Sequence, residues 1–267
     1  MEVPTLKLDH RPHRVKRHID IPGGYNIRDI GGYTTRDGRT IKWRKIFRAG
    51  LLTHIKDEGE DLMRDLQLRS ICDFRAPDEQ AANPDKWYQL DQLNRYSFPI
   101  GDGRPDKLHW LKAENLQDGD HHHLTLSNRS YVRQHPARFK AFFELLLNEA
   151  NYPLLYHCTA GKDRTGFATV LLLSALGVDW DQIIADYLLT NQYLEAFAEA
   201  TSQQLAIKSG IPQHLIKSIF QARMSFLKGA IDAINSDHGS IDIFLREAIG
   251  IGEAEKSQLR KILLEEA

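Results

Sequence analysis

Residues 153–176 have the sequence PLLYHCTAGKDRTGFATVLLLSAL, and this stretch decides the predicted fold. Its first five residues form a short, mainly apolar segment of the length expected for a buried strand. Residues 167–176 are apolar on nearly all sides, which indicates a buried helix, and Gly177 is placed to end it. A polar, glycine-containing loop, CTAGKDRTG, joins the two segments. A strand, a tight loop and a buried helix in this order predict an α/β fold.

The loop has the composition of an anion-binding site. Backbone N–H groups of a tight loop at a helix N-terminus converge on an anion, and the helix dipole favours negative charge there. A thiolate at Cys158 would be stabilised at the mouth of such a loop. Arg164, six residues later, can hold two phosphate oxygens with its planar guanidinium group. Gly161 allows the backbone to approach a ligand closely, and Thr165 places a hydroxyl where it can donate to the cysteine sulfur.

We therefore predict that the cysteine of this loop is a nucleophile. The alternative, a buried structural cysteine before a helix, does not explain the polar run GKDRT at the end of a strand. The loop is not a nucleotide-binding GxxxxGK[ST] loop, because Lys162 is followed by Asp163. The residues expected to surround the phosphate are Thr159, Ala160, Gly161, Lys162, Asp163, Arg164 and Thr165.

The composition limits the other classes of function. The chain has 267 residues and a formal net charge of -1, so no global field would recruit nucleic acid. Cys72 and Cys158 are too few for a disulfide scaffold, no zinc-ligand spacing occurs, and we expect neither metal nor cofactor. The sequence shows no signal-peptide pattern and no transmembrane segment, so we expect a cytoplasmic protein, with export by another route left open.

The rest of the chain is consistent with one catalytic domain. Residues 1–20 are expected to form a basic tail, and residues 21–267 a single domain. Asp37-Gly38 predicts a hairpin turn, and Asp179 is expected to cap a helix. Residues 100–128 are polar, contain His121-His122-His123, and are long enough for a lid or active-site loop. Helices are predicted at 57–66, from 136 and through most of the chain after 190, and further strands at 69–74 and 94–98.

The pattern C-x5-R-T is the signature of the protein tyrosine phosphatase superfamily. More closely, HCTAGKDRTG resembles the loop of a bacterial and fungal branch of tyrosine phosphatase-like enzymes, sometimes grouped as atypical lipid phosphatases. Segments NIRDIGG at 26–32, FRAG at 47–50 and CDFR at 72–75 with Glu79 are similar to that branch as well, and so is the helical part from 185 onward. The resemblance covers most of the chain, from about residue 20 to the end.

This resemblance implies a phosphatase fold, with a central, mainly parallel sheet flanked by helices and extra C-terminal helices. It also implies a cysteinyl-phosphate intermediate and activity on phosphotyrosine, often with phosphoserine, phosphothreonine or phosphoinositides. Lys162 matches a loop lysine shared with phosphoinositide phosphatases, and Asp163 matches the general acid of the branch. Related enzymes often carry an aspartate after Phe-Pro, but here Ile100 follows Pro99, and Asp102 is the rival acid.

Several residues keep two interpretations. Arg28, Asp29 and Arg75 could line the site or could tie the N-terminal hairpin to the sheet. His157 could set the environment of the thiolate or could be hydrogen-bonded in the core. Cys72 could be a redox partner of the nucleophile, as in some lipid phosphatases, or a small buried strand residue.

Three classes of function follow for a chain of this kind. The first is an active phosphatase acting on a phosphorylated protein or a phosphoinositide. The second is a phosphate-binding module without turnover, and the third is a rhodanese-like sulfurtransferase, which also carries a group on a loop cysteine. The intact cysteine, arginine and threonine of the loop favour the first class.

Overall fold

A computed structural model of the chain describes residues 16–85, 93–101 and 122–266. Its centre is a five-stranded sheet with the order β1-β3-β6-β4-β5. Strands β3, β6, β4 and β5 run parallel, and β1 joins β3 in the antiparallel direction. The bounds are β1 Arg28–Asp29, β3 Ile46–Ala49, β4 Ser70–Asp73, β5 Asn94–Ser97 and β6 Leu154–His157. The expected α/β class with a mainly parallel sheet is confirmed.

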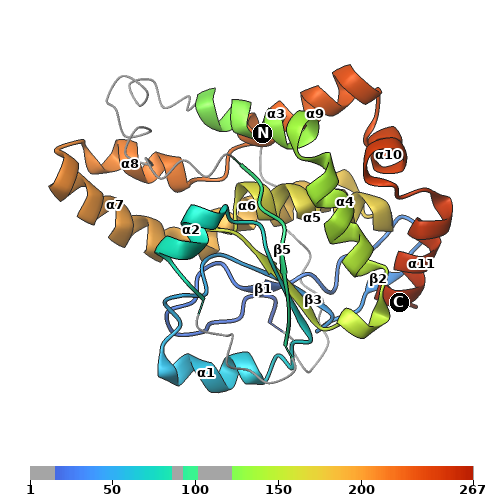
Figure 1. Cartoon of the computed structure of the whole chain (residues 1–267), viewed down its shortest axis with the longest axis horizontal. Coiled ribbons are helices and arrows are strands. Elements are labelled where there is room, and N and C mark those ends of the chain that lie inside the picture. The colour runs from blue at the N-terminus through green and yellow to red at the C-terminus, as the bar shows by residue number, and fades with distance from the viewer. Residues whose placement is uncertain (1–15, 86–92, 102–121, 267) are drawn as a thin grey trace.

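The sheet separates two hydrophobic cores because side chains alternate between its faces. Leu154 and Tyr156 of β6 point into the larger core, whereas Leu155 points into the smaller one. Helix α1 (Asp57–Arg64) covers the smaller core with Met63. Figure 1 shows α1 on one side of the strands and the remaining larger helices on the other.

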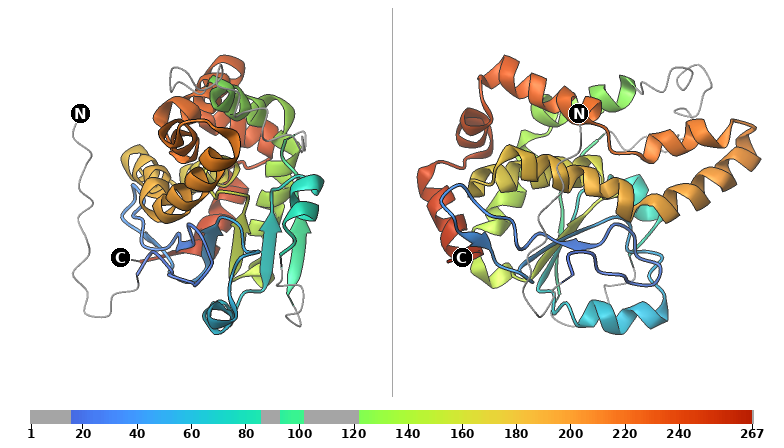
Figure 2. Two further views of the ribbon diagram at one scale, coloured as in Figure 1. Left: turned by 90° about the vertical axis from the view of Figure 1, so that its left-hand side faces the viewer. Right: turned by 180° about the vertical axis from the view of Figure 1, so that it is seen from behind.

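The second half of the chain is almost wholly helical and supplies the larger core. Helix α5, which follows the loop after β6, is buried along most of its length. It packs against α6, α9, α10 and α11 of this layer, and Figure 2 shows the layer from two further sides. The bounds of the first helices are α2 Pro77–Ala82, α3 His122–Gln134, α4 Pro136–Leu146, α5 Asp163–Leu176 and α6 Trp180–Tyr193. The later ones are α7 Glu195–Ser209, α8 Gln213–Phe220, α9 Met224–His238, α10 Ile241–Phe244 and α11 Glu253–Leu263.

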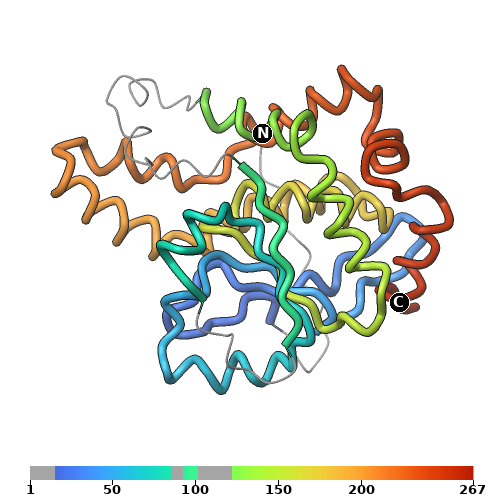
Figure 3. The backbone as a smooth tube through the Cα atoms, viewed as in Figure 1, coloured from blue at the N-terminus to red at the C-terminus, as the bar shows by residue number. Residues whose placement is uncertain are grey.

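Helices α7 and α8 form a hairpin that projects from the body of the molecule, as the tube in Figure 3 shows. They pack mainly against each other, around a small apolar cluster centred on Ile216. The tip carries Ile207, whose exposed fraction is 81%.

The C-terminal end of the described chain pairs with a segment of the N-terminal region in a small second sheet. Strand β2 (Thr40–Ile41) pairs with the C-terminal β7 (Leu264–Glu265), a pairing that the sequence did not predict. The predicted turn at Asp37-Gly38 is present, with a bridge between Thr34 and Thr40 and a φ of +86° at Gly38. Gly177 ends α5 in the left-handed conformation, as expected.

Three expectations need correction or lie outside the described residues. Asp179 occupies the N-cap position of α6, but its side chain makes no capping bond and pairs with Arg36 at 3.4 Å instead. The segment 100–128 was predicted to be a loop, but it is helical from residue 122 onward, in α3, because Leu124, Tyr131 and Val132 supply an apolar face. The part of this segment from 102 to 121, which includes His121, lies outside the described residues. Of the expected tail, residues 1–15 also lie outside, whereas Arg17 donates to the Asp29 carbonyl at 2.8 Å and so belongs to the packed body.

Among the described helices, none is long and apolar enough to cross a bilayer.

Candidate active site

The carboxyl ends of four parallel strands place the loop after β6 at one edge of the sheet. Cys158 follows the central strand directly and is 2% exposed. On one side, Leu51 after β3 donates its N–H to the Thr159 carbonyl at 2.9 Å. On the other side, segments after β4 and β5 approach the loop through Phe74 and Ile100. Ligands of open α/β sheets bind at such an edge.

The backbone of residues 159–164 is arranged as an anion cradle. Within the described parts of the chain, none of its N–H groups donates a hydrogen bond to another residue. Gly161 has a φ of +65°, and a Cβ there would lie 2.5 Å from the Ala49 carbonyl oxygen, so only glycine fits. Free N–H groups at the start of the long helix α5 provide the donors that a phosphate dianion needs.

Arg164 is held at the mouth of the loop by Glu79 of α2. Its Nη1 lies 2.5 Å from Glu79 Oε2 and its Nη2 lies 3.0 Å from Glu79 Oε1. Thr159 Oγ1 donates to the same carboxylate at 2.5 Å, and Ala76 N–H donates to it at 3.0 Å. Burial alone would lower the pKa of Arg164, but its bonds to Glu79 raise that pKa above the usual value, so the guanidinium stays charged. Glu79 thus holds both terminal nitrogens of Arg164, a contact that was not predicted from the sequence.

Lys162 and Asp163 lie at the start of α5 and contact each other. Lys162 Nζ lies 3.4 Å from Asp163 Oδ2 and donates to the carbonyls of Ile219 at 2.6 Å and Gln221 at 3.3 Å. Its ammonium group is therefore directed at the end of α8, and burial lowers the pKa of Lys162. Asp163 Oδ1 is buried and has no hydrogen-bond partner among the described residues, as would suit a carboxyl group that exchanges a proton with a ligand.

Thr165 does not make the bond expected of it in this structure. Its Oγ1 is buried and has no hydrogen-bond partner in the described chain, so no bond from it to Cys158 is formed. Tyr131 of α3 lies nearby: burial, and then the charge of Asp163, raise the pKa of Tyr131 above its usual value. The phenol therefore stays protonated on this side of the loop.

His157 and Arg75 are the remaining polar residues beside the loop. His157 is fully buried, and its Nε2 lies 3.4 Å from Asp85 Oδ2 and 3.9 Å from Asp73 Oδ1, but neither ring nitrogen makes a hydrogen bond within the described part of the chain. These three side chains could in principle hold a metal ion, since their ligand atoms lie within 4.8 Å of one another. However, Arg75 already pairs with Asp73 at 2.8 Å and with Asp85 at 2.6 Å, and its cation would repel a metal ion. Arg75 thus ties the end of β4 to the segment after α2.

A second buried network lies behind the loop. Asp186 of α6 pairs with Arg48 at 2.5 Å and with Arg28 at 3.2 Å, and it accepts a bond from Tyr33 at 3.0 Å. Burial opposes ionisation, but the two arginines lower the pKa of Asp186 well below its usual value. Asp29 accepts bonds from two backbone N–H groups, at Gly31 and Arg44. Of the two interpretations for Arg28 and Asp29, the contacts match the one that ties the N-terminal segment to the body.

Cys72 is fully buried on β4, opposite Tyr156 in the register of β4 and β6. Cys158 lies two residues beyond Tyr156. The usual spacings between strands and between residues along a strand then place the Cα atoms of Cys72 and Cys158 about 8 Å apart. A disulfide at this distance requires backbone movement. Burial raises the pKa of the Cys72 thiol well above its usual value, which disfavours its thiolate.

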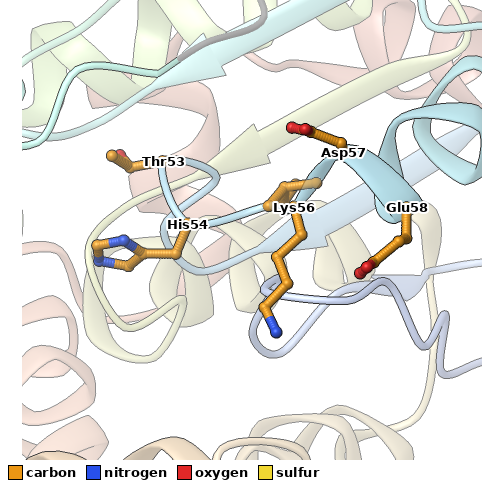
Figure 4. A pocket seen from close by; sticks show the side chains of 6 residues that line it. Thr53, His54, Lys56, Asp57 and Glu58 are labelled. Carbon is orange, nitrogen blue, oxygen red and sulfur yellow. The ribbon is translucent and has the colours of Figure 1, made fainter.

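A shallow depression lies on the same edge of the sheet, lined by residues 53–58 between β3 and α1 (Figure 4). Its lining side chains include Lys56, Asp57 and Glu58, so it carries both signs of charge. None of the loop residues 158–166 lines it. The depression is therefore distinct from the loop that carries Cys158.

Most residues singled out from the sequence lie in or around one loop. Cys158, Arg164 and the residues between them form a single turn at the start of α5. The rival acid Asp102 lies outside the described residues. Besides Glu79, the sequence interpretation missed roles for Asn26 and Arg48; both lie in segments, 26–32 and 47–50, that resemble the phosphatase branch, but the resemblance did not indicate what they contact.

Several known proteins that resemble this chain are phosphatases by name. A protein of Cupriavidus necator named as a tyrosine-protein phosphatase is 31% identical over 238 residues, covering 88% of this chain and 84% of that protein. The triple specificity protein phosphatase PtpB of Mycobacterium tuberculosis is 26% identical, covering 92% of this chain and 98% of that protein. Among solved structures, the catalytic domain of the PP-IP phosphatase SIW14 of S. cerevisiae has 18% identity and a TM-score of 0.33, covering 62% of this chain and 88% of that chain. The profile of the tyrosine phosphatase family matches residues 19–265, and with these relatives it shows that the chain is an enzyme of the tyrosine phosphatase family.

Proposed function

We propose that the chain hydrolyses phosphate monoesters through a cysteinyl-phosphate intermediate on Cys158. The observation that carries this proposal is the loop itself: backbone N–H groups without an acceptor in the described chain, a cysteine at the strand end and an arginine held at the loop's mouth. A dianionic phosphate bound there would meet the amides and Arg164 with its non-bridging oxygens, leaving the phosphorus open to Cys158.

The reaction would take two balanced steps. In the first, the thiolate sulfur of Cys158 attacks phosphorus, the bond to the ester oxygen breaks, and Asp163 gives its proton to that oxygen. In the second, water attacks the phosphorus of the cysteinyl phosphate, Asp163 takes a proton from the water, and the thiolate leaves. The products are the alcohol or phenol and inorganic phosphate.

We propose phosphotyrosine in proteins as the main substrate class, with phosphoserine, phosphothreonine and phosphoinositides as further substrates. The name of the Mycobacterium relative as a triple specificity phosphatase supports a broad range, and the similarity to it extends over nearly its whole length. The loop resembles that of lipid phosphatases in carrying Lys162.

The test compares wild-type protein and Cys158→Ser on a phosphotyrosine peptide, a phosphoserine peptide and short-chain phosphoinositides. We expect phosphate release from the wild type and a loss of at least about a hundredfold in the serine variant. Acid quenching after mixing with a substrate labelled in its phosphate should trap label on the wild-type protein only. Full activity of Cys158→Ser, or turnover without trapped label, would refute the covalent mechanism.

A further inference from the structure

Two consecutive carbonyl groups of the phosphate loop are held from behind by one side chain of the N-terminal segment. Asn26 Nδ2 donates to the Ala160 carbonyl at 3.1 Å and to the Gly161 carbonyl at 3.0 Å. Arg48 Nη2 of β3 donates to the Gly161 carbonyl as well, at 2.7 Å. Asn26 and Arg48 are both buried, so these bonds are shielded from water.

The planar trans peptide turns these contacts into a constraint on the anion donors. A carbonyl and the N–H of the following residue belong to one peptide plane and point in opposite directions. Holding the carbonyls of Ala160 and Gly161 outward therefore turns the N–H groups of Gly161 and Lys162 inward. These are two of the amides in residues 159–164 that have no acceptor among the described residues.

The backbone conformation of Asn26 and a bond to its side-chain oxygen favour this contact. Its φ is 54°, in the left-handed region, where asparagine is tolerated better than most residues. Its Oδ1 accepts a hydrogen bond from Arg28 Nη1, which fixes the amide so that Nδ2 faces the loop. One asparagine thus links the N-terminal segment to both carbonyls.

The buried positive charges behind the loop outnumber the negative ones. Arg28 and Arg48 share the single carboxylate of Asp186, and all three side chains are at most 1% exposed. The trio therefore carries one net positive charge, which is costly to bury unless a negative group lies close by. A phosphate bound in the loop, in contact with the peptide that Arg48 holds, would supply that negative charge.

We propose that Asn26 and Arg48 are positioning residues that set the anion-binding geometry of the phosphate loop, and that Asp186 anchors Arg48 in this role. The proposal depends on the loop being the phosphate site, but not on Cys158 being the nucleophile. Neither residue touches the phosphate, and each acts through the peptide groups that do.

The test measures binding of inorganic phosphate by titration calorimetry, with the full-length chain carrying Cys158→Ser as the parent so that turnover plays no part. Asn26→Gly removes the side chain but keeps the left-handed backbone accessible. We expect about a tenfold rise in the Kd for phosphate, because the two lost hydrogen bonds to carbonyls affect binding only through the orientation of the loop amides. Arg48→Met should weaken binding at least as much.

Asn151→Ala is the matched control. Asn151 is also a buried asparagine that donates to a carbonyl, at Leu145, but it lies before β6, at the opposite end of the strand from the loop. It should lower the melting temperature and leave the Kd within twofold of the parent. If Arg48→Met does not fold, Asn26→Gly together with Arg48→Lys decides the question, since lysine keeps the charge but loses the planar donor.

A Kd within twofold of the parent in folded Asn26→Gly would overturn the proposal. In proteins that retain Cys158, positioning predicts that KM rises along with any fall in kcat, whereas a purely structural role would lower only the melting temperature. Retained activity of Cys158→Ser would count against the proposed mechanism and would leave this result on phosphate binding unaffected.

Discussion

Replacing Glu79 tests how the loop arginine is prepared for its substrate. The carboxylate accepts bonds from both terminal nitrogens of Arg164, at 2.5 and 3.0 Å, and this pairing uses one edge of the guanidinium fork. A phosphate would use the edge formed by Nε and Nη2, where it would compete with Thr159 Oγ1, which accepts a bond from Nη2 at 3.3 Å. Two substitutions separate the geometry from the charge: Glu79→Gln removes the charge and one acceptor, and Glu79→Asp keeps the charge but shortens the reach by one methylene.

The expected loss follows from the bonds that are broken. A hydrogen bond to a charged group contributes about 1.5–3 kcal/mol, and Glu79→Gln exchanges two bonds between oppositely charged groups for one bond from the guanidinium to a neutral amide oxygen. A net loss of about 2 kcal/mol in transition-state binding corresponds to about a 30-fold fall in kcat/KM. Both side chains are largely buried, at 16% and 9% exposure, so solvent screens this pair little.

The assay is steady-state hydrolysis of an aryl phosphate and a phosphotyrosine peptide, with the melting temperature as a check on folding. If Glu79 orients Arg164, both variants lose kcat/KM. If its charge mainly weakens phosphate binding, Glu79→Gln binds inorganic phosphate more tightly and Glu79→Asp does not. Unchanged kcat/KM in a folded Glu79→Gln protein would refute the orientation argument.

Three further predictions concern the loop and its neighbours. Asp163→Asn should lose much more rate on an aryl phosphate with a poor leaving group than on one with a good leaving group, because a positioned acid contributes about 10²–10⁴ in rate. If Asp163→Asn instead loses the same factor on both substrates and Asp102→Asn shows the dependence on the leaving group, the general acid is Asp102. Lys162→Met should raise KM for a phosphoinositide more than for a simple aryl phosphate, whereas equal losses on both would mean that its bonds to the end of α8 support the loop. Mild peroxide should inactivate the enzyme reversibly, and peptide mapping should decide whether Cys158 links to Cys72; because the thiol of Cys72 is buried and its pKa is raised, we expect any such link to form slowly.

The sequence was sufficient for the central βα unit. In residues 153–176 the apolar pattern, the glycines and the polar loop all indicate the same strand–loop–helix arrangement, and the structure has β6 and α5 there. Helix α1 and strands β4 and β5 were also predicted, because each has a local pattern of apolar residues and turn signals.

The contacts that complete the site were not predictable from local patterns. Glu79 belongs to a short polar helix, and nothing in its neighbourhood indicates that it faces Arg164. The pairing of β2 with β7 joins residues 40 and 265, and a two-residue strand carries too little pattern to specify its partner. Asp186 lies on a helix whose sequence looks like that of an ordinary core helix, and only the fold shows which two arginines it pairs with.

The bonds from Asn26 to the loop also constrain the order in which the molecule assembles. Asn26 and Gly161 are 135 residues apart in the chain, and Arg48 and Asp186 are 138 apart. Contacts of such long range close large loops and form late, whereas helices form from local contacts. After dilution from denaturant, the helical circular dichroism signal should therefore recover before phosphatase activity, and simultaneous recovery would contradict this order. A chain interrupted at that stage, with its helices formed and its first fifty residues not yet docked, would already contain Cys158 and Arg164 but would bind phosphate more weakly than the folded protein.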